Sequence, residues 1–274
     1  MTSIFACPKC RQGLAEHPAT YTCPLGHSFD KAASGYVNLL QPKESHAVGD
    51  NKEMISARRH FLSGGWYLPL RDTLSQMMKQ VLPQGGVWLD AGCGEGWYAE
   101  GICQALSDAD NPVFCFGVDI SKDALKYAAK RQVPSMRLAV GSVYHMPVLD
   151  HSCDAVLNVF APLVPDVYQR ILKRGGHLLL AVPHTTHLWG LKEVLYDTPY
   201  PNPVSDTHLD GFALIEEQMV QSRITLTKKE DIQSLFVMTP YAYRTGERGR
   251  QRLLALDHLE TEISFKVLLY QLAF

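Results

Sequence analysis

One glycine-rich turn constrains the fold of this chain more than any other segment. Residues 87–90, Val-Trp-Leu-Asp, have the apolar composition of a short buried strand. The turn Ala-Gly-Cys-Gly-Glu-Gly follows at 91–96, and an apolar helix is predicted from 97 to 106. A strand that passes through a glycine turn into a helix is typical of the first unit of a doubly wound α/β sheet.

The pattern beyond this turn extends the sheet. Four further strands are predicted at residues 113–118, 136–140, 153–160 and 176–182, and helical patterns occur at 70–81 and around 124–129. Strands that alternate with helices pair in parallel, and the ligands of such sheets bind at the carboxyl ends of the strands. We therefore expect an α/β, Rossmann-like domain with a ligand site at that edge.

The spacing of the glycines distinguishes between cofactors. A dinucleotide-binding turn has the pattern G-x-G-x-x-G and receives a pyrophosphate at a helix N-terminus. Here the pattern is D-x-G-x-G-x-G, which resembles the first motif of the S-adenosylmethionine-dependent methyltransferases. The resemblance implies cofactor contacts at Asp90, Gly92, Gly94 and Gly96 in the turn, at Asp119 for the ribose hydroxyls, and at Ser142 beside the adenine.

Two pairs of possible metal ligands, one Cys–Cys and one Cys–His, precede the α/β pattern. Cys7-Pro-Lys-Cys10 and Cys23-Pro-Leu-Gly-His27 are separated by twelve residues. Four ligands at this spacing can hold one Zn²⁺ in a tetrahedron, which leaves no open position for catalysis. A DNA-reading finger carries two histidines on a helix, whereas the second pair here lies in a helix-breaking turn. We expect a structural zinc ribbon or rubredoxin-like knuckle rather than free thiols, since so small a module needs the metal for stability.

Composition excludes several other classes. The chain has 274 residues, seven cysteines and a net charge of −2. An odd cysteine count does not fit a disulfide framework, and no apolar run reaches the ~18 residues of a membrane span. No basic stretch followed by a hydrophobic one opens the sequence, so we expect a cytoplasmic protein. We assign residues 1–36 to a zinc-binding module, 37–67 to a connecting segment and 68–274 to the methyltransferase domain.

The two modules together resemble one family, the large-subunit ribosomal RNA guanine-N1 methyltransferases of the RlmA type. The shared features are the two ligand pairs, the glycine turn and several further segments. Those segments include Gly35-Tyr36-Val37-Asn38-Leu39-Leu40, Gly49-Asp50, Ala57-Arg58-Arg59, Tyr67-x-Pro69-Leu70, Phe160-Ala161-Pro162, His187-Leu188 and Met238-Thr239-Pro240. The resemblance runs nearly end to end and is loose close to the C-terminus.

This resemblance implies methylation of guanine N1 in a hairpin loop of 23S ribosomal RNA, with S-adenosylmethionine as donor and a zinc module that assists RNA recognition. It implies zinc ligation by Cys7, Cys10, Cys23 and His27, and cofactor contacts at Tyr67, Gly94, Glu95 and His187. RNA contacts are expected at Arg58, Arg59 and Phe160, because proteins grip structured RNA through its phosphates and stack its loop bases on aromatic rings.

Some alternatives stay open at this point. Asn158, Phe160 and Pro162 lie near the end of the predicted strand 153–160, where many base methyltransferases bind the target base. His184 and Asp166 could accept a proton by their position, but neither is assigned, and the catalytic base is unknown. A small-molecule methyltransferase would account for the second domain and not for the zinc module. A nonenzymatic binding module and a homodimer are further alternatives.

Overall fold

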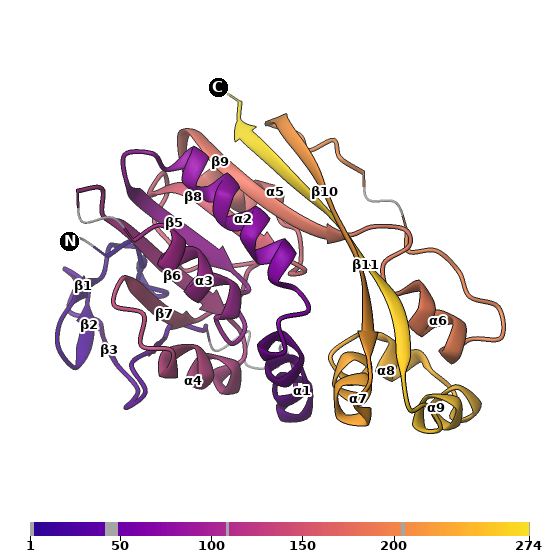
Figure 1. Cartoon of the computed structure of the whole chain (residues 1–274). Coiled ribbons are helices and arrows are strands. Elements are labelled where there is room, and N and C mark those ends of the chain that lie inside the picture. Colours follow the sequence, from indigo (N-terminus) through magenta and orange to yellow (C-terminus); the bar gives the residue numbers. More distant parts are fainter. Residues whose placement is uncertain (1–2, 42–48, 108–109, 204–205, 274) are drawn as a thin grey trace.

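The computed structural model describes residues 3–41, 49–107, 110–203 and 206–273. At its centre is an eight-stranded sheet in the order β10-β11-β9-β8-β5-β6-β7-β4 (Figure 1). The five central strands are β5 (Gly86–Ala91), β6 (Val113–Asp119), β7 (Met136–Val140), β8 (Cys153–Val159) and β9 (Leu172–Pro183), and they pair in parallel. The predicted α/β, Rossmann-like fold is confirmed.

Two of the predicted strands have different ends. β8 ends at Val159 because Phe160 adopts a φ of 59°, in the left-handed region that an extended strand cannot include. β9 begins at Leu172 rather than at Gly176, because the ladder to β8 continues across an irregularity between Cys153 and Ala155.

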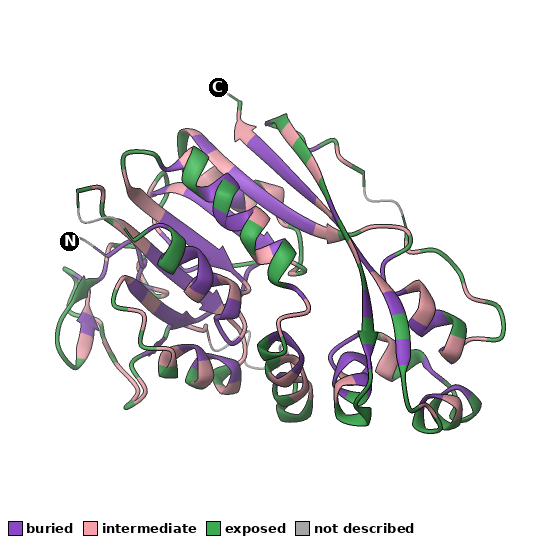
Figure 2. Ribbon diagram, in the orientation of Figure 1, coloured by how far each residue is buried: buried purple, intermediate pink, exposed green. Residues whose placement is uncertain are grey.

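Helices cover one face of the sheet. They are α2 (Leu68–Val81), α3 (Trp97–Ala105) and α4 (Lys122–Lys130), close to the predicted ranges. Their buried side chains, such as Leu74, Ile102 and Leu125, join strand residues in one core, and the outer sides of the helices are exposed (Figure 2). None of the helices in the described part of the chain has the length and apolar composition that a membrane span requires.

The N-terminal module and α5 (Pro165–Ile171) cover the opposite face. The module contains the three-stranded antiparallel sheet β1 (Ala15–Glu16), β2 (Thr20–Thr22) and β3 (Ser28–Asp30). The Phe5 ring lies 5.1 Å from the Phe116 ring of β6, and Phe5 bridges to Val148. Residues 141–152 form no helix, so the module takes the place of a covering helix there.

The segment that follows the module joins the main sheet. β4 (Val37–Asn38) pairs in parallel with β7, and Val37 lies opposite Ala139. After the gap in the described residues comes α1 (Lys52–Ser63), which Asn51 caps by accepting a hydrogen bond from the N–H of Met54 at 2.9 Å. Figure 1 shows α1 between α4 and α7.

Two long strands carry a C-terminal lobe. β10 (Phe212–Leu226) and β11 (Leu259–Leu272) are antiparallel and run past the end of β9 (Figure 1). The lobe contains α6 (Trp189–Leu195), α7 (Lys229–Val237), α8 (Tyr241–Arg244) and α9 (Glu247–Leu254). Nε2 of His60 in α1 lies 2.7 Å from Oδ1 of Asp231 in α7, so α1 connects the core to the lobe.

Candidate active site and metal centre

A cavity of about 340 Å³ lies at the carboxyl ends of β5, β6, β7 and β8. Seven of the residues predicted to contact the cofactor line it, namely Asp90, Gly92, Gly94, Glu95, Gly96, Asp119 and Ser142. The fold therefore brings together side chains from three strand ends at the edge where the ligand of a doubly wound sheet binds. We call this space the first cavity.

The glycine turn forms a cradle along this cavity. Gly92, Gly94 and Gly96 have φ values of 81°, 55° and 78°, in the left-handed region that favours glycine. A Cβ on Gly92 would lie 2.6 Å from the Cβ of Ala161, whereas a Cβ on Gly94 would meet no atom within 4 Å. The turn is thus packed closely at Gly92 and open at Gly94, where the backbone can approach a ligand.

Asp119 holds the turn from the neighbouring strand. Its Oδ2 accepts a hydrogen bond from the N–H of Gly94, and its Oδ1 accepts one from the N–H of Ser121, each at 2.8 Å. Burial raises the pKa of Asp119, and the nearby Asp50 acts in the same direction. Burial and the charge of Asp119 also raise the pKa of Asp90, to about 8. The Asp119 carboxylate at this edge disfavours a phosphate ligand.

Glu95 is the most deeply buried charged group of the turn, with 3% of its side chain exposed. Its Oε2 forms an ion pair with Arg131, and Nε of Arg131 donates to the carbonyl oxygen of Glu95 at 2.7 Å. Burial raises the pKa of Glu95, although Arg131 opposes this shift. Oε1 of Glu95 has no hydrogen-bond partner among the described residues. Arg131 thus fixes a carboxylate that keeps one acceptor for a ligand.

A second cavity, of about 650 Å³, adjoins the first. The two share the lining residues Asp50, Arg58, Leu62, Tyr98, Phe160 and Ala161. The other walls of the second cavity come from the end of β9 and from the C-terminal lobe, including Met238, Tyr241 and Arg244. Ligands in the two cavities would therefore meet at the shared residues, which we call the boundary.

Tyr67 and His187 line the second cavity and not the first. The Tyr67 hydroxyl lies 3.3 Å from Nε2 of His187, and the N–H of Ser264 donates to Nδ1 of His187 at 3.2 Å. Burial lowers the pKa of His187 to about 3 and raises the pKa of Tyr67, so both side chains are neutral at pH 7. The cofactor contacts implied for these two residues stay a prediction.

The residues after β8 form part of the boundary. Nδ2 of the fully buried Asn158 donates to the carbonyl oxygen of Pro162 at 3.1 Å and to the Tyr168 hydroxyl at 2.7 Å. These bonds hold the segment that carries Phe160, which is 44% exposed and lies with its ring 5.2 Å from the Phe265 ring. A ring with one exposed side at the boundary can stack on a planar ligand.

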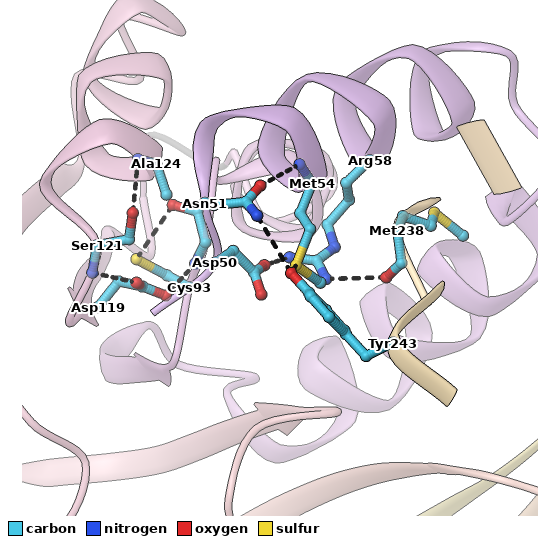
Figure 3. Close-up of polar contacts among 11 residues, drawn as sticks. Asp50, Asn51, Met54, Arg58, Cys93, Asp119, Ser121, Ala124, Met238 and Tyr243 are labelled. Atoms are coloured by element: carbon cyan, nitrogen blue, oxygen red, sulfur yellow. Dashed lines mark hydrogen bonds and ion pairs between the residues drawn. The ribbon is translucent and has the colours of Figure 1, made fainter. Parts of the chain in front are cut away.

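Arg58 and Arg59 lie close to the glycine turn. Figure 3 shows Arg58 between Asp50, with which it forms an ion pair, and the carbonyl oxygen of Met238, to which it donates at 3.3 Å. The guanidinium of Arg59 lies 4.2 Å from the centre of the Tyr127 ring and 3.9 Å from Oε2 of Glu95. Both arginines, which were predicted as RNA contacts, are therefore also neighbours of the first cavity.

The four predicted zinc ligands come together in the N-terminal module. The Sγ atoms of Cys7, Cys10 and Cys23 and a ring nitrogen of His27 lie within 4.8 Å of one another. Cys10 and Cys23 are 3.6 Å apart at sulfur, and Sγ of Cys23 is 3.3 Å from Nδ1 of His27. Zinc with sulfur ligands at about 2.3 Å places those sulfurs about 3.8 Å apart, so the group fits one tetrahedral ion. Four protein ligands make the site structural.

Sequence reasoning gave no role to several residues of the second cavity. Asp50, Tyr98 and the segment from Met238 to Arg244 are among them. Gly49-Asp50 and Met238-Thr239-Pro240 belong to the segments on which the family resemblance rests. That these segments are shared with the family, although no role was assigned to them, was the one sign in the sequence that they could line a functional site. His184 and Asp166, considered as proton acceptors, line neither cavity.

The first cavity suits S-adenosylmethionine. That molecule has an ammonium group and two ribose hydroxyls, which donate hydrogen bonds, and it has no phosphate. Oε1 of Glu95 and the carboxylate of Asp119 are acceptors, and Gly94 leaves room for a ligand at the backbone. The fold and the site define the class of this protein as an S-adenosylmethionine-dependent methyltransferase with an N-terminal zinc ribbon.

Comparison with known proteins narrows this class. The family model described as "RlmA, N-terminal" matches residues 5–46, and the model "Methyltransferase domain" matches residues 89–179. A Micromonospora griseorubida protein called "Putative 23S rRNA (guanine-N(1)-)-methyltransferase" is 34% identical over 275 residues, 92% of this chain and 91% of its own. The chain belongs to the RlmA family of 23S rRNA (guanine-N1)-methyltransferases.

Two further proteins are similar to a smaller part of this chain. The "23S rRNA (guanine(748)-N(1))-methyltransferase" of Streptomyces fradiae is 34% identical over 192 residues, 69% of this chain and 66% of its own. The crystal structure of the YcgJ protein from Bacillus subtilis superimposes with a TM-score of 0.46 at 16% identity, and the match covers 73% of this chain and 98% of that one.

Proposed function

We propose that this protein transfers a methyl group from S-adenosylmethionine to N1 of a guanine in a hairpin loop of 23S ribosomal RNA. The observation that carries the proposal is the boundary shared by the two cavities. In this proposal the cofactor binds in the first cavity and the target guanine in the second, so that N1 faces the methyl group across the boundary. The names of the relatives support the choice of RNA and of the guanine nitrogen.

The chain's own residues have to align the two partners. Bound S-adenosylmethionine supplies a methyl group on a sulfonium, and direct displacement depends chiefly on how donor and nucleophile are positioned. The turn at Gly92–Gly96, with Glu95 held by Arg131 and Gly94 held by Asp119, positions the donor. Asn158 fixes the segment after β8, and Phe160 on that segment stacks on the target base.

The target base must leave its stack before it can enter the second cavity. A hairpin loop suits this requirement because its bases are already partly unstacked. Tyr144 lines the first cavity and is 60% exposed, and Phe160 is 44% exposed at the boundary. We assign Tyr144 to a loop base next to the target, since stacking of a base on an aromatic ring contributes about 1–3 kcal/mol.

The zinc module supports RNA recognition from the same side. Arg11 donates to the carbonyl oxygens of Met146 and Val148, at 3.2 Å and 3.1 Å. These residues belong to the loop that carries Ser142 and Tyr144 to the first cavity. The module is therefore fixed to the wall of the cofactor site, and we propose that the RNA hairpin contacts both.

Charge reversal at Arg58 and Arg59 is expected to affect the binding of both RNA and cofactor. Arg58→Glu with Arg59→Glu is expected to weaken RNA binding. Because Arg58 lines the first cavity and Arg59 lies near Glu95, the same variant should also weaken cofactor binding. Separate calorimetric titrations with S-adenosylhomocysteine and with the RNA hairpin would measure the two effects.

The test of the function is transfer of labelled methyl from S-adenosylmethionine to large-subunit RNA from a strain that lacks this protein. We expect labelled 1-methylguanosine at one hairpin after nucleoside analysis, and none with Asp119→Asn, which loses a carboxylate of the first cavity. Light scattering on the complex of the protein with the RNA hairpin would measure whether one or two copies of the protein bind each hairpin. Binding of the cofactor without any transfer to RNA would refute the RNA substrate and favour a small-molecule acceptor.

A further inference from the structure

Asp50 lies at the boundary, and no other acidic residue among those that the structure describes lines both cavities. Six described residues line both cavities: Asp50, Arg58, Leu62, Tyr98, Phe160 and Ala161. Arg58 is already protonated, and burial raises the pKa of the Tyr98 hydroxyl, so neither can take up a proton near pH 7. The remaining three, Leu62, Phe160 and Ala161, are apolar. Among the described residues of the boundary, only the Asp50 carboxylate can accept a proton.

The surroundings of Asp50 hold its carboxylate in place. Oδ2 of Asp50 forms an ion pair with Nη1 of Arg58, whose Nη2 donates to the carbonyl oxygen of Met238 at 3.3 Å (Figure 3). The next residue, Asn51, caps α1 and donates to the Tyr243 hydroxyl at 3.1 Å. The Asp50 side chain is still 30% exposed. It is therefore fixed by α1 and, through Arg58, by the lobe, and still accessible to a ligand.

Other candidate proton acceptors are less suitable. Asp90, Glu95 and Asp119 line the first cavity alone, on the side of the cofactor. His187 lines the second cavity, but its Nδ1 already accepts a hydrogen bond from Ser264. Asp206 lines the second cavity away from the boundary.

We propose that Asp50 is the catalytic base that accepts the N1 proton of the target guanine, an inference that rests on the function proposed above. Guanine N1 carries a hydrogen, so its electron pair becomes available for bonding only as that proton leaves. The N1–H bond breaks and an O–H bond forms on Asp50. The electron pair of N1 forms the new N–C bond while the C–S bond of the donor breaks and its pair stays on sulfur. The protonated Asp50 then returns its proton to water.

The test compares single-turnover rates of methyl transfer to the RNA hairpin for four variants. Asp50→Asn keeps the size of the side chain and removes its basicity, and Asp50→Glu keeps the carboxylate. Arg58→Gln breaks the ion pair but leaves the Asp50 carboxylate. Asp210→Asn is the matched control, because that exposed acid lies outside both cavities.

We expect Asp50→Asn to lower the rate roughly 10²- to 10⁴-fold, the usual contribution of general base catalysis. Affinities for S-adenosylhomocysteine and for RNA, measured by calorimetry, should stay within about threefold, and Asp210→Asn should match the wild type. Asp50→Glu and Arg58→Gln should each retain more activity than Asp50→Asn. A hairpin with 6-thioguanine at the target, whose N1–H is more acidic, should reduce the defect of Asp50→Asn.

Three results would overturn the role of Asp50. They are a rate for Asp50→Asn close to the wild-type rate, a loss for Arg58→Gln as large as that for Asp50→Asn when RNA and S-adenosylmethionine are both saturating, and a defect that 6-thioguanine leaves unchanged. Failure of the wild-type protein to methylate any RNA is a different result, which refutes the proposed function itself.

Discussion

The backbone N–H of Ser264 donates a hydrogen bond to Nδ1 of His187 over 3.2 Å. A ring nitrogen that accepts a hydrogen bond carries no proton, so the neutral imidazole has its proton on Nε2. Nε2 lies 3.3 Å from the Tyr67 hydroxyl oxygen, which thus accepts a hydrogen bond from His187 and keeps its own proton for another acceptor. The backbone amide of Ser264 in β11 therefore determines that His187, in the wall of the second cavity, donates its hydrogen bond through Nε2.

His187 should make the fold sensitive to acid. Burial lowers its pKa from 6.5 to about 3. Between these pH values the unfolded chain binds a proton that the native protein does not, so the free energy of unfolding falls as the pH falls through this range. The slope from this residue is at most about 1.4 kcal/mol per pH unit.

Urea denaturation at neutral pH and near pH 5 would measure this effect. We expect His187→Gln to lose less stability on acidification than the wild type, while His208→Gln, at an exposed histidine, behaves like the wild type. Equal acid sensitivity in His187→Gln and the wild type would show that His187 is not the source.

Removal of zinc should destabilise the methyltransferase domain as well as the module. Phe5, Leu14 and Tyr21 of the module are buried in the same core as Phe116 of β6. Loss of the metal frees these side chains and exposes that face of the sheet. We expect a lower Tm for the whole chain after chelation or in Cys10→Ser, with metal content measured in parallel. Recovery with zinc and not with magnesium is the control, and an unchanged Tm after proven metal loss would contradict the prediction.

Gly92→Ala should mainly lower the stability of the protein, whereas Gly94→Ala should mainly weaken cofactor binding. Both residues have a positive φ, which costs an alanine about 1–2 kcal/mol. The Cβ in Gly92→Ala would also lie 2.6 Å from Ala161, so this variant should lose more stability. Gly94→Ala has room for its Cβ but places it beside the ligand, so it should fold and bind cofactor weakly. Thermal unfolding and calorimetry with S-adenosylhomocysteine separate the two, and equal Tm values would argue against this account.

Arg131→Met should weaken cofactor binding without changing a residue of the first cavity. Arg131 pairs with Glu95 and with Glu100, and its loss would leave the buried Glu95 carboxylate with only the half-exposed Arg59 at 3.9 Å as a cation. Breaking a buried pair in this way costs about 3–5 kcal/mol. We expect a lower Tm and about tenfold weaker binding of S-adenosylhomocysteine, the lower end of the range found when residues that orient metal ligands are removed.

Lys126→Met is the matched control for Arg131→Met. Lys126 forms an exposed pair with Asp123 on α4, and such pairs contribute little. A loss of cofactor affinity as large in Lys126→Met as in Arg131→Met would mean that the effect comes from the charge of this surface rather than from Glu95.

The sequence by itself determined the parts of this protein whose contacts are local. The strand β5, the turn at residues 91–96 and α3 follow one another directly, and their composition specifies an apolar strand, positive φ values and an amphipathic helix. The zinc ligands could be predicted for the same reason, because each Cys or His pair reaches one ion from a single turn.

Only the tertiary structure decided what the second cavity contains. Arg58 meets Met238, Asn51 meets Tyr243, and His187 meets Ser264, each pair from distant parts of the chain. The spacing of apolar residues in the sequence indicates which face of a helix or strand is buried. It does not indicate which distant helix or strand covers that face. The long strands β10 and β11 carry the lobe back to α1, and this return places Asp50 at the boundary between two cavities, a position that no local pattern could reveal.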